Sequence, residues 1–191
     1  MSKAAVFFAP SMQWKPLHLW PKALHPDIHL QNWLQDKGSL TARLVAKSHG
    51  RFAVEVVRQF IGRPSFGECR ALNIKHSNLA LIREVILKGN GQPWVFARSL
   101  LPLASLTGKL RHLRKQTNRP LGAFLFSQPH LARSPIEVAC ISRDHSYIPA
   151  NLIGGQRLWG RRSIFYLEHK PLLVSEVFLP DFIASSPTIS A

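Results

Sequence analysis

The chain has 191 residues, of which 46% are hydrophobic and 18% charged, so it can form one domain with its own core and is too apolar for a disordered protein. Its two cysteines, Cys69 and Cys140, lie far apart in the sequence, which excludes a disulfide framework and a zinc ribbon. The net charge of +15 indicates an anionic ligand and does not distinguish nucleic acid, lipid headgroups and small polyacids.

Residues 1–26 are predicted to form an irregular arm, because prolines recur along this segment and interrupt both helical and strand patterns. Its apolar stretch, residues 4–9, is shorter than the apolar region of a signal peptide. The longest charge-free stretch of the chain, residues 120–132, is too short to cross a bilayer. We therefore expect a cytoplasmic protein.

Two short helices are predicted after the arm. Asp27 can cap the first, which ends at Gly38, and Ser39 can cap the second, which begins at Leu40. Apolar residues recur at helical spacing in both: Leu30, Trp33 and Leu34 in the first, Leu40 and Leu44 in the second.

From residue 51 the hydrophobic period changes to two, which predicts strands. The first strand directs four apolar side chains to the core: Phe52, Val54, Val56 and Phe60. Residues 79–88 and 94–101 form two more strands, and the turn 89–91 between them, Gly-Asn-Gly, is typical of a β-hairpin.

A helix, a short helical segment and a second hairpin follow. The helix is indicated by Leu106, Leu110 and Leu113. Pro120 stands in the first turn of the short segment. The hairpin joins residues 164–167 to residues 172–179 around the turn 169–171.

Tight turns between neighbouring strands predict the α+β class, as a single domain with an antiparallel β-sheet and helices packed against it. The domain is placed at residues 27–182, between the arm and a C-terminal tail at 183–191. Residues 127–157 are rich in Ser, Pro and Gly and are interpreted as a long, partly irregular connection.

Two charged residues occupy strand positions where the alternation favours apolar side chains. Arg83 shares its face with Leu79, Leu81, Val85 and Leu87. Glu176 shares its face with Leu172, Val174 and Phe178. A guanidinium in such a place requires an anion, and a carboxyl group requires a partner or a raised pKa.

Two interpretations of these residues stay open. In the first, Arg83 and Glu176 pair with each other or lie on a solvent-exposed face. In the second, both line a pocket, where Arg83 binds a carboxylate through two hydrogen bonds and Glu176 contacts a hydroxyl at the other end. The first-turn N–H groups of Leu40 and Leu121 favour the pocket, because such groups bind anions, although every helix has them.

Other motifs that would indicate a chemistry are missing from the sequence. The Gly-Asn-Gly turn does not continue as a dinucleotide-binding loop, and no Walker or Gly-x-Ser-x-Gly motif occurs. His25, Asp27 and His29 could approach a metal but lie beside a proline at the end of the arm, so neither a metal nor a cofactor is expected. The basic runs 111–115 and 161–162 are interpreted as solvated faces.

Five separated blocks between Trp33 and Pro180 form a specific pattern. The blocks are Leu81-Ile82-Arg83-Glu84-Val85-Ile86-Leu87, Pro93-Trp94 with Ala97-Arg98 and Pro102, Pro120-Leu121-Gly122 with Leu125-Phe126, Leu158-Trp159-Gly160-Arg161-Arg162-Ser163, and Lys170-Pro171-Leu172-Leu173 with Glu176 and Phe178-Leu179-Pro180. In their order and spacing these blocks resemble the chorismate pyruvate-lyase family.

The resemblance implies a cofactor-free lyase that converts chorismate to 4-hydroxybenzoate and pyruvate, the first committed step of bacterial ubiquinone synthesis. It also implies that flap-like helical segments bury the product against an antiparallel sheet. In that family an arginine matching Arg83 binds the product's carboxylate. The backbone N–H groups of residues matching Leu40 and Leu121 bind the same carboxylate, and a glutamate matching Glu176 contacts the product's hydroxyl. Arg83 and Glu176 are therefore the expected catalytic residues.

The alternative is a non-catalytic effector-binding domain, since the effector domains of one group of bacterial transcription regulators share this fold. Those regulators place a winged helix ahead of it, and 26 residues are too few for one, so no obligatory nucleic-acid partner is expected. We expect chorismate as the small-molecule partner and a monomeric chain. The basic surface could also serve peripheral contact with an anionic membrane.

Overall fold

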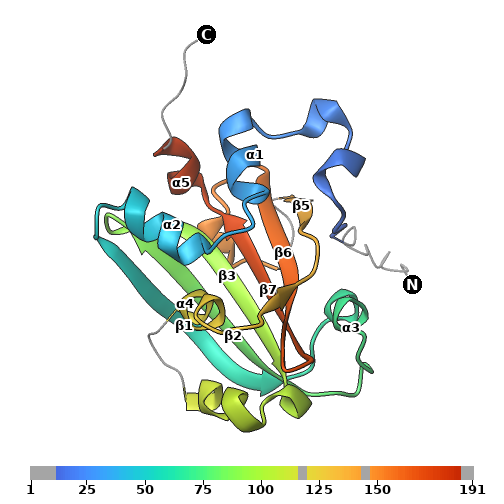
Figure 1. The fold of residues 1–191 in the computed structure, drawn as a ribbon. Coiled ribbons are helices and arrows are strands. Elements are labelled where there is room, and N and C mark those ends of the chain that lie inside the picture. The colour runs from blue at the N-terminus through green and yellow to red at the C-terminus, as the bar shows by residue number, and fades with distance from the viewer. Residues whose placement is uncertain (1–11, 116–119, 143–146, 186–191) are drawn as a thin grey trace, which may run out of the picture.

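One antiparallel sheet forms the frame of the protein in the computed structural model, which describes residues 12–115, 120–142 and 147–185 (Figure 1). The strand order is β1-β2-β3-β7-β6-β4, and β5 also pairs with β6. The strands are β1 Phe52–Gly62, β2 Ala80–Gly89, β3 Gln92–Pro102, β4 Ala132–Arg133, β5 Glu137–Ile141, β6 Leu158–Leu167 and β7 Lys170–Phe178. Helices packed on this sheet confirm the predicted α+β class.

Helices cover both faces of the sheet, so β2 is buried along nearly its whole length. The helices are α1 Ile28–Leu34, α2 Leu40–Lys47, α3 Phe66–Leu72, α4 Leu121–Phe126 and α5 Pro180–Ala184. α1, α2 and α4 pack on one face, whereas α3 packs Leu72 against Ile82 and Leu100 on the other. Short 3₁₀ helices lie at Leu17–Leu19, Lys22–Leu24, Leu103–Ser105, Gly108–Lys115 and Ala150–Leu152.

The helices α1 and α2 begin where the sequence predicts. The Asp27 carboxylate accepts a hydrogen bond from the Leu30 N–H at 2.9 Å, and the Ser39 hydroxyl accepts one from the Ala42 N–H at 3.3 Å. These side chains satisfy first-turn donors that have no partner within the helix. The cap at Ser39 fixes Leu40 as the first residue of α2, above the sheet.

Three helical features differ from the prediction. α1 ends at Leu34 rather than at Gly38, and beyond it the Asp36 carboxylate turns the chain by accepting from the Gly38 N–H at 2.7 Å. The helix predicted from three leucines is a 3₁₀ helix, Gly108–Lys115, and it begins after Leu106 because the chain turns at Gly108, which has a positive φ of 56°. Pro120 precedes α4 as its N-cap residue instead of standing in its first turn.

A β-bulge corrects the predicted alternation of β1. The pairing of β1 with β2 shifts register between Val56 and Arg58, so the residues beyond it change faces. Phe60, predicted in the core, is consequently 37% exposed, and its ring lies 5.1 Å from the Arg58 guanidinium.

Both hairpins are present, and the second differs in its turn. Leu167 pairs with Lys170, so the chain turns at Glu168 and His169, both at positive φ, rather than at 169–171. Residues 127–157 are more regular than predicted, because β4 and β5 lie within them and pair with the edge of β6. An unpaired β6 edge would expose its N–H and C=O groups, which this pairing prevents.

The described part of the predicted arm packs on the sheet. Lys15 exchanges two backbone hydrogen bonds with Val138 of β5, and the Trp20 ring meets the Trp159 ring edge-on at 5.3 Å. Residues 1–11 and 186–191 lie outside the described residues, and the domain limits at 27 and 182 stay a prediction. In the described ranges no helix is long and apolar enough to span a bilayer.

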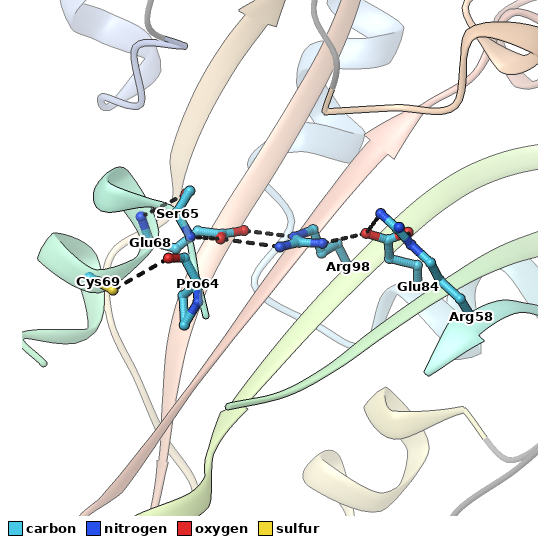
Figure 2. Close-up of polar contacts among 7 residues, drawn as sticks. All are labelled: Arg58, Pro64, Ser65, Glu68, Cys69, Glu84 and Arg98. Atoms are coloured by element: carbon cyan, nitrogen blue, oxygen red, sulfur yellow. Dashed lines mark hydrogen bonds and ion pairs between the residues drawn. The ribbon is translucent and has the colours of Figure 1, made fainter. Parts of the chain in front are cut away.

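An ion network around two buried carboxylates links α3 to the sheet (Figure 2). It lies on the face opposite α2 and α4. Arg98 of β3 donates to Glu68 of α3 at 2.8 Å and to Glu84 of β2, and Arg58 of β1 donates to Glu84 at 2.5 and 3.0 Å. Glu68 also closes a capping box with Ser65. Four elements therefore depend on two carboxylates that are almost fully buried.

We predict that Glu84→Gln lowers the free energy of unfolding at neutral pH by about 3 kcal/mol, because the buried Arg98 loses a carboxylate partner. Burial raises the pKa of Glu84, but hydrogen bonds from Arg58 and Arg98 bring it below the usual value. This carboxylate therefore stabilises the fold above pH 4.5, and the stabilisation is lost as the pH falls.

Urea unfolding of wild type and variant at several pH values measures both effects. The difference in the free energy of unfolding between wild type and Glu84→Gln should be largest near neutral pH and should decrease in acid. Glu55→Gln is the matched control, since its ion pair with Lys88 is half-exposed and contributes at most about 1 kcal/mol. Equal losses in both variants would contradict a stabilising role for the network.

Candidate active site

A cavity between the sheet and the helices α2 and α4 brings together all four residues singled out in the sequence: Leu40, Arg83, Leu121 and Glu176. On the sheet side it is lined mainly by Arg83, Val85, Ala97, Ser99, Arg161, Phe165, Val174 and Glu176. On the other side it is closed by Gly38, Leu40, Thr41, Pro120, Leu121, Gly122, Leu125 and Phe126, and Arg133 of β4 borders it at the edge of the sheet. Figure 1 shows α2 and α4 in front of the sheet.

Arg83 enters this cavity from β2. Its strand neighbours on the same face, Leu81 and Val85, are buried, and Arg83 itself is only 5% exposed. Burial lowers the pKa of the Arg83 guanidinium, since removal from water disfavours the charged form. A ligand carboxylate would relieve that cost, because it supplies both a counter-charge and hydrogen-bond acceptors.

Glu176 enters from β7 and is held by Arg161 of β6. The Arg161 Nε donates to Glu176 Oε2 at 2.7 Å, and Arg161 Nη1 donates to the carbonyls of Trp33 and Asp36, each at 2.8 Å. The ion-pair partner that the sequence left open is thus Arg161 rather than Arg83. Because this ion pair uses Oε2, Oε1 is the Glu176 oxygen that the described contacts leave for a ligand hydroxyl.

The strand pairing sets the separation of the two predicted catalytic side chains. Arg83 pairs across β3 with Val174 of β7, two residues before Glu176. Neighbouring strands lie about 4.8 Å apart and each strand residue rises about 3.4 Å, so the Cα atoms of Arg83 and Glu176 are separated by roughly 12 Å. Both residues line the same cavity, one from each side of β3.

The two helix starts lie on the opposite wall of the cavity. Leu40 is the first residue of α2 and Leu121 the first residue of α4, so their N–H groups belong to first helical turns. The helices approach closely here, since a Cβ at Gly122 would lie 3.0 Å from Thr41 Oγ1. Glycine therefore permits the contact by which α2 and α4 close the cavity.

Two arginines that line this cavity, Arg133 and Arg161, were not recognised in the sequence. Residues 161–162 were interpreted as a solvated face, but Arg161 is 1% and Arg162 is 9% exposed, because each has a carboxylate partner on a neighbouring strand. The alternation of β6 could have shown that Arg161 shares a face with Trp159 and Phe165. Arg133 lies in β4, within the segment interpreted as irregular, and no pattern marked it.

Arg133 lies beside the Arg161–Glu176 pair. Its Nη1 donates to the Lys37 carbonyl at 2.9 Å, next in the chain to the Asp36 carbonyl that Arg161 binds, and its guanidinium lies 4.9 Å from the Phe165 ring. Burial lowers the pKa of Arg133 to about 10, and the charge of Arg161 adds to this shift. At neutral pH it remains a cation.

The structure does not support a metal site at His25, Asp27 and His29, the residues that the sequence analysis considered. In the ranges that the structure covers, no three His, Cys, Asp or Glu side chains gather as metal ligands would. The His25 ring instead makes a hydrogen bond with the Trp20 carbonyl at 3.0 Å, and Asp27 caps α1.

Comparisons with known proteins show the family of this chain. A family model described as chorismate lyase matches residues 15–186. The probable chorismate pyruvate-lyase of Aromatoleum aromaticum is 41% identical over 160 residues, which cover 81% of this chain and 86% of that protein. The probable chorismate pyruvate-lyase of an Azoarcus species is 44% identical over 159 residues, or 79% and 84% of the two chains.

Solved structures with the same fold are more distant in sequence. A GntR-family regulator from Bacillus cereus has a TM-score of 0.53 at 13% identity and covers 73% of this chain and 99% of its own. The effector domain of PhnF from Mycobacterium smegmatis has a TM-score of 0.51 at 15% identity, with 75% and 90% covered. At such identities the likeness concerns the fold alone.

Proposed function

The chain belongs to the chorismate lyase family, and we propose on that premise that it converts chorismate to 4-hydroxybenzoate and pyruvate. The match of the family model over residues 15–186 carries this proposal. The cavity supports it, because a buried arginine and a carboxylate face a space between sheet and helices, as an aromatic acid with a para hydroxyl requires.

Arg83 anchors the ring carboxylate of chorismate in this proposal. Its planar guanidinium can donate two parallel hydrogen bonds to the two carboxylate oxygens. The N–H groups of Leu40 and Leu121 approach the same carboxylate from the helix side, where first-turn donors favour an anion. These contacts fix one end of the ring and therefore the position of its reacting carbons.

Glu176 receives the C4 hydroxyl of chorismate. Loss of the C4 hydrogen and cleavage of the bond from C3 to the enolpyruvyl oxygen leave an aromatic ring, and the enolpyruvyl group takes up a proton to become pyruvate. Because aromatisation drives the reaction, the protein needs only to orient the substrate and place charge. Arg161 is a positioning residue here, since it holds Glu176 Oε2 and leaves Oε1 to the hydroxyl.

The single assay that tests the proposal is incubation of the purified protein with chorismate. We predict equal amounts of 4-hydroxybenzoate and pyruvate, and a rate that persists in EDTA, because the elimination needs no Lewis acid. A non-catalytic effector domain, suggested by the fold of the regulators alone, would bind an aromatic acid without turnover. Chromatographic and enzymatic measurement of the two products distinguishes these outcomes.

We also propose a cytoplasmic, monomeric enzyme without a nucleic-acid partner, whose net charge of +15 steers a dianionic substrate. The Debye length falls from about 10 Å at 0.1 M salt to about 3 Å at 1 M, so attraction at a distance weakens with salt. We therefore predict that kcat/KM decreases as NaCl is added, while kcat stays nearly constant because the enclosed step is not screened.

The same charge could instead hold the protein at an anionic membrane. Stopped assays over a salt series, together with co-sedimentation with anionic and zwitterionic vesicles, separate the two uses. A salt-independent kcat/KM combined with salt-sensitive binding to the anionic vesicles would reject steering and favour the membrane.

A further inference from the structure

We infer that Arg133 binds the second carboxylate of the substrate, the one on the enolpyruvyl group. This inference rests on the proposed function, because chorismate carries two carboxylates and 4-hydroxybenzoate only one. Arg83 and the two helix starts account for the carboxylate on the ring. A second anion inside a largely buried cavity requires a cation of its own.

The strand order places Arg133 on the correct side of the substrate. Across the sheet β2 carries Arg83, β7 carries Glu176, and β4, beyond β6, carries Arg133. Chorismate has its ring carboxylate at one end, its hydroxyl at the opposite ring carbon and its enolpyruvyl ether next to that hydroxyl. With the carboxylate at Arg83 and the hydroxyl at Glu176, we infer the ring orientation in which the enolpyruvyl group, next to the hydroxyl, points toward β6 and β4.

The contacts of Arg133 leave it able to receive a carboxylate. In the described part of the chain its Nη1 is bonded to the Lys37 carbonyl, whereas its buried Nε has no hydrogen-bond partner there. The described ion pairs give Arg161 and Arg162 a carboxylate each, and they give Arg133 none. A buried guanidinium with an unused donor gains both a counter-charge and a hydrogen bond when a carboxylate arrives.

The surroundings hold the guanidinium in position before the substrate binds. The Lys37 carbonyl fixes one edge, and the Phe165 ring supports the side chain at 4.9 Å. The neighbouring anions are already neutralised, since Glu176 pairs with Arg161 and Asp36 pairs with Arg43. Arg133 also lines a second cleft with Lys37, His18 and His25, so this residue borders both hollows.

The experiment compares a ligand that has the second carboxylate with one that lacks it. We expect Arg133→Gln to lower kcat/KM for chorismate by about 30-fold and to change the Kd of 4-hydroxybenzoate by less than twofold. As a probe that needs no turnover, 3-(carboxymethoxy)-4-hydroxybenzoate should bind the wild type and lose about 30-fold in affinity in the variant. Arg133→Lys keeps the charge and should recover part of both losses.

Arg51→Gln is the matched control, because it removes the same charge from an exposed position and should leave both affinities unchanged. If Arg133→Gln loses equal affinity for the monocarboxylate and the dicarboxylate, the inference is overturned. Arg133 would then have a structural role through its hydrogen bond to the Lys37 carbonyl. Unchanged kinetics would overturn it as well. Failure of the wild type to turn over chorismate would instead reject the proposed function, while the binding comparison of the two benzoates would still test Arg133.

Discussion

Replacing Arg83 by alanine is expected to lower kcat/KM for chorismate by about 30-fold or more while the protein remains folded. Removing one partner of a desolvated charged contact costs about 2 to 5 kcal/mol, which corresponds to this range. Arg83 is 5% exposed and lies on the cavity wall, so in the variant little water can reach the substrate carboxylate to compensate for the lost guanidinium. Steady-state kinetics with wild type and variant measure the loss.

The binding of 4-hydroxybenzoate gives a second measurement of the same residue. Because the product keeps the ring carboxylate, Arg83→Ala should weaken its binding as well, in contrast to Arg133→Gln. Arg83→Lys should recover only part of the affinity, since an ammonium group lacks the paired donors of a guanidinium. Near-wild-type activity of both variants, with unchanged thermal unfolding, would show that the ring carboxylate binds elsewhere.

The sequence could reveal Arg83 and Glu176 because each interrupts an otherwise apolar strand face. Such an interruption is visible wherever alternation is regular, as it is along β2 and β7. The turn between β2 and β3 was equally clear, since Asn90 and Gly91 adopt the positive φ values that such a turn requires. Most of the sheet and two of the cavity's charged groups therefore follow from local patterns.

The alternation of β6 could place Arg161 on a face with Trp159 and Phe165, but it could not show that Arg161 is buried, because its burial depends on groups that are distant in the chain. Both faces of β6 are covered, so two adjacent arginines resemble an exposed basic run until their partners are known. Arg161 is neutralised by Glu176, 15 residues away, and its Nη1 is satisfied by the carbonyl of Trp33, 128 residues away. Only the folded chain brings these groups together.

The irregular parts of the fold were missed for a related reason. The bulge after Val56 depends on pairing with β2, and no residue type in β1 indicates its position. The two-residue strand β4 forms because β6 offers a free edge, and its own sequence, Ala132-Arg133, has little strand preference. Tertiary pairing therefore decides both the exposure of Phe60 and the place of Arg133 in the cavity.

Replacing Glu176 by glutamine is expected to lower kcat by a factor on the order of 10², the range over which side chains that assist proton movement contribute. The amide keeps the size of the side chain, so the substrate still fits. It cannot balance the charge of Arg161 or accept the C4 hydroxyl hydrogen bond as strongly as a carboxylate. The loss should therefore appear in kcat more than in KM.

Glu137→Gln is the control for this variant, because Glu137 pairs with the neighbouring Arg162 at 2.8 Å and does not line the cavity. Both substitutions remove a carboxylate from an arginine on β6, so a purely structural effect would be similar in the two proteins. If Glu137→Gln keeps its rate and Glu176→Gln loses it at equal thermal stability, the effect belongs to the cavity. Equal kcat values in wild type and Glu176→Gln would show that the C4 hydroxyl does not depend on this carboxylate.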